Sequence, residues 1–260
     1  MPAFATPAPV AATVEVAGAQ VRVTASDRTD TVVLVKPIND ASRSDVRVAS
    51  RTKVDLAGGQ LSVKTTTPGD KSGSVTITID LPAGSSLAAY LAHSSVQADG
   101  PLGQCELHLA SGQVELERID ALKASIASGG VAIGHIAGPA NIDGSAFTMR
   151  IGEVTGTVEF SSAGGDFDID RADGSITATT AGGAIRIGRM TRGQAKLMNG
   201  SGNIEVGIGE GTAATVDVNS ERGAVHDYVS PQPNPDPSDH EVMVHARTRH
   251  GDIIIQRAAS

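Results

Sequence analysis

The sequence predicts an all-β fold, a single-chain β-solenoid (β-helix) of repeats about 16–21 residues long, with a less regular N-terminal β region. Three observations support this prediction. A short word recurs along the chain, in which a small residue and a glycine precede two alternating apolar residues, as in "SGQVELE" and "SGNIEVG". The chain contains 30 glycines, which favours many turns. Aromatic residues make up only 2%, so Val, Ile, Leu and Ala must form the core in thin, regular layers.

The spacing of this word is regular. Its first apolar residue falls at nine positions, and seven of the eight steps between them measure 16 to 21 residues: Val96, Val114, Val131, Phe147, Phe167, Ile185, Ile204, Val225 and Ile253. A second alternating segment such as "CELHLA" precedes the word, so each repeat reads as strand, turn, strand and loop. In a solenoid each repeat stacks on its own copy about 4.8 Å away, which explains why one word recurs. A sandwich of hairpins is the alternative.

Glycine stands in each word where the chain must turn sharply or adopt a positive φ. We therefore expect a set of structural turn glycines: Gly112, Gly129, Gly165, Gly183, Gly202, Gly223 and Gly251. Replacing such a glycine by valine should harm folding rather than abolish a specific activity.

The chain is expected to contain three parts: an N-terminal tail at 1–11, an N-terminal β region or cap at 12–86, and solenoid repeats at 87–257. In the cap the turn word recurs only at Gly18 and Gly59, which indicates longer coils that cover the unpaired end of the stack. The segment "SPQPNPDPSDH" at 230–240 carries four prolines, so we expect an extruded loop that explains the last, 28-residue step. A role of this loop in recognition stays open.

Composition excludes several classes of protein. A net charge of −8 disfavours binding to nucleic acid. Cys105 is the only cysteine, so no intramolecular disulfide can form, and we expect a buried, inert thiol. The chain has no run of 18 apolar residues, so we expect no direct membrane insertion. The opening "MPAFATPAPVAATVEV" lacks the basic segment of a signal peptide, so a cytoplasmic location is expected.

Candidate chemistry is sparse, and we expect no catalytic residue, cofactor or metal. The segment "GGDFDIDRADGS" offers Asp166, Asp168 and Asp170 as weak metal candidates. A calcium-binding nonapeptide repeat would need glycine at Phe167 and would recur in tandem, so a solvated acidic face is favoured.

The seven histidines are scattered along the sequence. His226 is followed directly by Asp227, and His245 shares a polar face with Met243 and Arg247, which favours exposure over a zinc or catalytic role. The chain contains no nucleophile elbow, phosphate loop, zincin motif or dinucleotide fingerprint.

Three long stretches resemble the DUF4097 family, which carries the label adhesin, in its cytoplasmic actinobacterial form. They are "TPAPVAATVEVAGAQVRVTASDRTDTVVLVKP", "DVRVASRTKVDLAGGQLSVK" and "SVTITIDLPAGSSL", and the glycine words follow them. The resemblance implies a β-helix and supplies no catalytic residues. Surface roles in this family accompany signal peptides or membrane anchors.

We therefore expect a non-enzymatic scaffold that binds a protein partner, or a second copy of itself, through sheet faces or solenoid ends. The alternatives are a carbohydrate-binding or carbohydrate-processing β-helix and an enzyme with unrecognised chemistry. A carbohydrate site of the usual kind would need aromatic platforms and paired carboxylates along a groove. An enzyme would gather Asp166, Asp168, His226 or His245 in one pocket.

Overall fold

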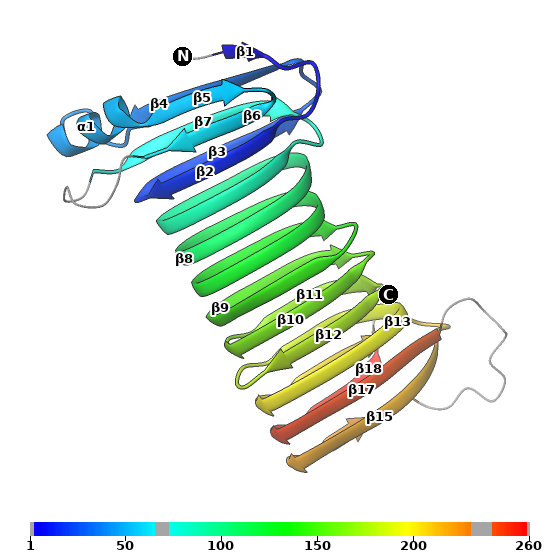
Figure 1. The fold of residues 1–260 in the computed structure, drawn as a ribbon. Coiled ribbons are helices and arrows are strands. Elements are labelled where there is room, and N and C mark those ends of the chain that lie inside the picture. The colour runs from blue at the N-terminus through cyan, green and yellow to red at the C-terminus, as the bar shows by residue number, and fades with distance from the viewer. Residues whose placement is uncertain (1–2, 66–72, 230–240, 259–260) are drawn as a thin grey trace. The chain divides into compact units, whose positions relative to one another are not determined.

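A computed structural model describes residues 3–65, 73–229 and 241–258 (Figure 1). The expected proline-rich loop at 230–240 lies outside these residues. The all-β prediction is confirmed, since the described residues form strands throughout, apart from one helix. The chain divides into two compact units, Met1–Ala132 and Ile133–Ser260, and each is described by itself.

The first unit combines parallel and antiparallel strands. Its elements are β1 (Ala3–Ala5), β2 (Ala11–Ala17), β3 (Ala19–Ser26), β4 (Asp30–Pro37), α1 (Arg43–Arg51), β5 (Lys53–Ala57), β6 (Gln60–Lys64), β7 (Val75–Pro82) and most of β8 (Ser86–Ile136). Strand β2 runs parallel to β6 and β8, and β3 runs parallel to β7 and β8. Strands β4 and β5 then pair antiparallel with β7 and β6. The parallel order therefore changes to antiparallel at β4 and β5, as a blunted cap would require.

Helix α1 was not expected inside the N-terminal β region, because "DVRVAS" alternates like a strand. Local hydrogen bonds favour the helix: the Ser42 side chain caps it by accepting from the Asp45 amide. Asp45 is only 8% exposed and accepts from the backbone amides of Ser74 and Asn39, which ties the helix start to its neighbours. The expected tail at 1–11 likewise contains a strand, since β1 pairs antiparallel with β4.

The second unit contains the end of β8 and ten further strands. These are β9 (Ala140–Val154), β10 (Thr157–Gly164), β11 (Phe167–Asp173), β12 (Ser175–Thr180), β13 (Ile185–Ser201), β14 (Ile204–Ile208), β15 (Ala213–Arg222), β16 (Val225–Asp227), β17 (Glu241–His250) and β18 (Ile253–Arg257). The pairings among these strands in the described residues are parallel, and Val158 faces Ile176 as Phe167 faces Ile185, one repeat later in the chain. Equivalent apolar residues therefore stack in rows, and one such row is completely buried: Ile151, Ile169, Ile187, Val206 and Ile255.

The last strands do not stack in the order of the sequence. Strand β17 lies between β13 and β15, and β18 lies between β14 and β16. Among the described residues, β15 and β16 therefore each pair on one side only. Val225 faces Ile253 in the row of its buried counterparts but is 43% exposed, because β16 pairs on one side only among the described residues.

Candidate functional site

The glycines of the repeated word lie where one turn of the chain passes close to the next. Six of the seven expected turn glycines have φ between 102° and 142°, and Gly223 does not adopt a positive φ. A Cβ on Gly202 would lie 2.1 Å from the carbonyl oxygen of Gly183, which leaves no room for a side chain. These positions therefore restrict the backbone and offer no cradle for a ligand.

Three buried polar side chains that the sequence analysis missed support these turns. Ser162, Thr180 and Asn199 are 8%, 3% and 6% exposed, and their side-chain oxygens accept from the backbone amide two residues later. The signal in the sequence is a Ser, Thr or Asn two residues before the small residue of the word. Such buried polar side chains satisfy backbone groups that strand pairing cannot reach at a turn.

The aspartates at 166–170 do not form a free acidic face. Asp168 is 20% exposed at its side chain and lies 2.9 Å from Arg186 Nη2 and 3.9 Å from Arg150 Nε. Arg186 also lies 2.9 Å from Asp170, and Asp166 accepts from the Ala184 amide at 2.8 Å. Arg150 and Arg186 lie on the strands next to Asp168, so their pairing with the aspartates can be seen only once the strands are stacked.

Four residues on neighbouring strands form a row of alternating charge on the outward face. We call this row the charge ladder: Arg150, Asp168, Arg186 and Glu205. The hydrogen bond to Asp168 raises the pKa of Arg186 above its ordinary value. In the part of the chain that the structure describes, no group of three or more His, Cys, Asp or Glu side chains could hold a metal ion.

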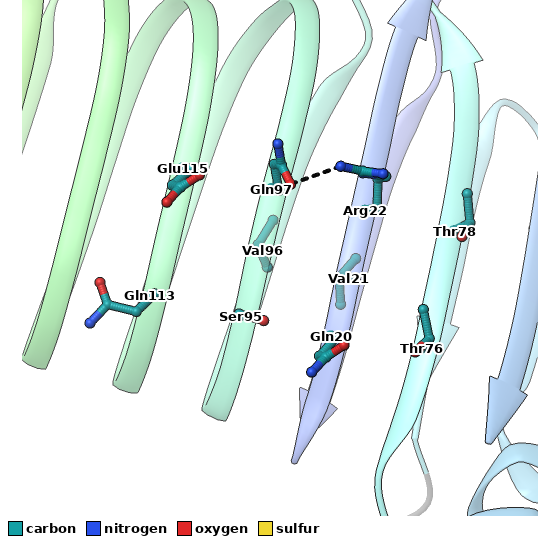
Figure 2. Close-up of a pocket in the computed structure, with 10 residues that line it drawn as sticks. All are labelled: Gln20, Val21, Arg22, Thr76, Thr78, Ser95, Val96, Gln97, Gln113 and Glu115. Atoms are coloured by element: carbon teal, nitrogen blue, oxygen red, sulfur yellow. Dashed lines mark hydrogen bonds between the residues drawn. The ribbon is translucent and has the colours of Figure 1, made fainter. Parts of the chain in front are cut away.

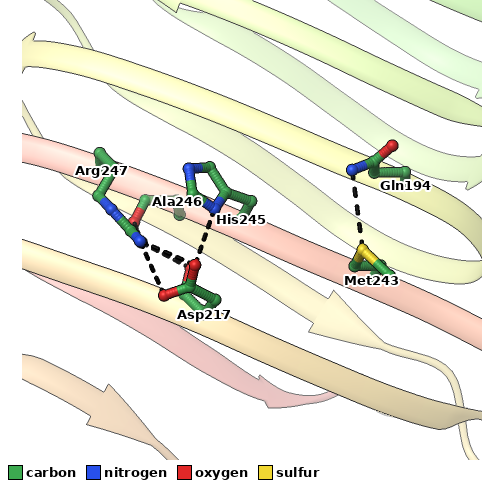
Figure 3. Close-up of polar contacts among 6 residues, drawn as sticks. All are labelled: Gln194, Asp217, Met243, His245, Ala246 and Arg247. Carbon is green, nitrogen blue, oxygen red and sulfur yellow. Dashed lines mark hydrogen bonds and ion pairs between the residues drawn. The ribbon is translucent and has the colours of Figure 1, made fainter.

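A second polar cluster joins β17 to β15 (Figure 3). Arg247 Nη2 lies 2.8 Å from both carboxylate oxygens of Asp217, and His245 Nδ1 lies 3.0 Å from Asp217 Oδ2. The hydrogen bond from Arg247, followed by that from His245, lowers the pKa of Asp217. His245 therefore lies at the surface as expected, with a hydrogen-bond partner that the sequence did not indicate.

Asp166 and Asp168 lie two residues apart, but neither His226 nor His245 joins them. Asp168 and His226 stand in one outward row, but Arg186, Glu205 and Ile254 separate them. His245 lies on β17, which pairs with β15 and does not belong to the row that contains Asp168 and His226. Cys105 is fully buried, and this burial raises its pKa to about 12, so its thiol is inert.

Two of the hollows on the described surface are candidate binding sites, one in each unit. A groove of 460 Å³ in the first unit has a polar lining from β7, β3 and β8 (Figure 2). A hollow of 580 Å³ in the second unit is lined by β12, β13, β17 and β15, and includes Met198, Arg247 and Arg249. Among the described residues, no helix is long and apolar enough to cross a membrane.

Comparison with known proteins reveals a family and distant structural likenesses. A crystal structure described as a "putative adhesin" from Parabacteroides merdae is 9% identical, with 99% of this chain and 95% of that chain covered and a TM-score of 0.47. A "putative adhesin" from Parabacteroides distasonis is 10% identical, with coverage of 99% and 95% and a TM-score of 0.43. A "putative lipid binding protein" from the same organism is 12% identical, with coverage of 99% and 96% and a TM-score of 0.40.

No curated protein matches the chain. The family model described as Toastrack DUF4097 matches residues 12–256, which is nearly the whole sequence. The chain therefore belongs to the DUF4097 (Toastrack) family.

Proposed function

We propose that this chain is a non-enzymatic β-solenoid that binds another protein through the outward face of β13, β17 and β15. One observation carries the proposal: Met198 and Met243 are 45% and 46% exposed on this face, and Met198 lines the 580 Å³ hollow together with Arg249. Methionine and arginine are enriched in protein interfaces, and flexible methionine side chains adapt to a partner's shape.

The state of the candidate catalytic groups supports a non-enzymatic role. Asp168 and Asp217 are held in ion pairs between neighbouring strands, and His245 is bound to Asp217. A general acid or base must lie within reach of a substrate together with its partners. These side chains instead hold strands together.

The terminal strands argue for association through faces rather than ends. Asp227 occupies the place in the inward row that Ile255 and Val206 fill on the neighbouring strands. A charge in the inward row of an edge strand is a known protection against edge-to-edge association. This charge disfavours extension of the stack by a second copy and favours a partner on the face.

Photo-methionine labelling in the native cell tests the proposal. We expect cross-links to a second protein from Met198 and Met243. Met149 and Met190 are fully buried and serve as internal controls. Met198→Glu together with Met243→Glu should abolish the cross-linked complex, whereas Thr177→Glu on the same sheet should not. Cross-links that stay within the chain would overturn the proposal.

The cytoplasmic location and the actinobacterial type remain predictions from the sequence. Cell fractionation with an antibody against the folded chain would test the location.

A further inference from the structure

We propose that the groove in the first unit binds a linear, neutral oligosaccharide laid across the strands. This inference is independent of the proposed protein interface, which lies in the other unit. Buried Val21 and Val96 form the floor of the groove, and polar side chains on either side of them form its walls (Figure 2). Its volume of 460 Å³ lies within the range of small-molecule sites, about 300–1,000 Å³.

The polar side chains form two rows that cross neighbouring strands. Gln20 on β3 faces Thr76 on β7 and Ser95 on β8, while Arg22 faces Thr78 and Gln97. The next turn of β8 adds one residue to each row, Gln113 and Glu115 (Figure 2). Because neighbouring strands lie about 4.8 Å apart, each row offers a polar group at that interval. This interval is close to the advance per sugar ring in an extended glycan.

Most of these polar side chains have no hydrogen-bond partner among the residues that the structure describes. Within the described residues, the side-chain hydrogen bonds of the groove are from Arg22 to Gln97 at 3.1 Å and from Gln97 to Asp99 at 3.5 Å. The other side chains that line it make no side-chain hydrogen bond in that part of the chain: Gln20, Thr76, Thr78, Ser95, Gln113 and Glu115. Amide and hydroxyl groups can both donate and accept, as the hydroxyls of a sugar do.

The charge of the lining selects a neutral ligand. Among the described residues that line the groove, only Arg22 and Glu115 are charged, and their charges cancel. A polyanion would need several cations, and an apolar ligand would leave the amides without partners. The groove has no aromatic platform, so hydrogen bonds alone would hold the sugar. We therefore expect weak affinity, on the order of millimolar for a short oligosaccharide.

Titration followed by NMR tests the inference on the full chain. The probes are hexasaccharides of β-1,4-glucan, α-1,4-glucan, β-1,4-xylan and β-1,4-N-acetylglucosamine, with an oligogalacturonate as the anionic comparison. We expect at least one neutral probe to shift the side-chain amide signals of Gln20, Gln97 and Gln113 in a saturable way. The oligogalacturonate should not.

Two variants connect binding to the groove. Gln20→Ala and Gln97→Ala should each weaken binding about fivefold, since each removes hydrogen bonds to the sugar. Gln194→Ala is the matched control, because Gln194 lies in the other unit and contacts Met243. The inference is overturned if no neutral probe produces saturable shifts, if oligogalacturonate binds more tightly, or if the groove variants bind as well as the control.

Discussion

The same strand position carries different side chains in the two units. In the first unit, Arg22, Gln97 and Glu115 each follow an inward valine, and the groove around them is rich in unpartnered amides and hydroxyls. In the second unit the corresponding position carries the charge ladder, whose members follow inward residues such as Phe167 and Ile185.

This difference separates two physical demands. The inward residues are apolar and buried in both units, because stacking of the repeats fixes them. The outward residues contact neighbours only along their row, so they can either satisfy one another or remain available. In the charge ladder the outward residues pair with one another, whereas in the groove most of them remain available to a ligand.

The largest effect is expected where stacking leaves no space. Gly202→Ala places a Cβ about 2.1 Å from a backbone oxygen at a φ of 134°, and should cost at least ~3 kcal/mol of unfolding free energy. Gly211→Ala is the control: φ is 73°, but nothing lies within 4 Å, so only backbone strain of ~1 kcal/mol is expected. Urea unfolding measures both. Equal losses would show that close stacking does not govern these glycines.

A second effect concerns the inward charge of β16. Asp227→Val would continue the apolar row of Ile255 onto the edge strand β16, so we expect increased self-association at ~10 μM by sedimentation velocity. Glu221→Val removes an exposed charge from β15 and serves as the control. If both variants associate equally, removal of charge rather than its inward position is responsible.

A smaller effect compares the two outward rows directly. Asp168→Ala breaks the charge ladder and leaves Arg186 with a single close carboxylate, so a loss of ~1 kcal/mol is expected, and it should shrink in high salt. Gln97→Ala should cost less, about 0.5 kcal/mol, with no dependence on salt. Chemical unfolding at low and high ionic strength measures both. A Gln97→Ala loss as large as that of Asp168→Ala would contradict the view that the groove residues are not needed for stability.

The smallest effect depends on pH. Because its folded-state pKa is lowered, Asp217 stabilises the fold at pH values above the ordinary aspartate pKa. This contribution is lost as the pH falls through the lowered value. Amide protection factors in β15 should therefore fall in that acidic range, and Asp217→Asn should remove this dependence. Asp45 also has a lowered pKa, mainly from the Ser74 amide, so α1 should respond with the same sign. Protection in β15 that is constant through this range would exclude the role assigned to Asp217.

The candidate sites were predictable only in part. The alternation of "FDID" places Phe167 and Ile169 inward and the aspartates outward, as the structure has them. The partners of those aspartates come from "TMRIG" and "AIRIG", one repeat before and after, and their identity depends on the register between strands. The groove has no sequence motif at all, because β7, β3 and two turns of β8 contribute one or two polar residues each.

The sequence by itself determined the all-β class, the inward residues and the word at each turn, because a period of two and a glycine with positive φ are local requirements. Only the tertiary structure decided three other features: the helix at Arg43–Arg51, the place of β17 and β18 between earlier strands, and the pairing of outward side chains. The last two depend on contacts between residues that are far apart in the sequence, and the helix adds a long-range contact of Asp45 to its local cap at Ser42. Asp45 accepts a hydrogen bond from the Ser74 amide. Strand β17 pairs with β13 and β15, so its neighbours do not follow the order of the chain.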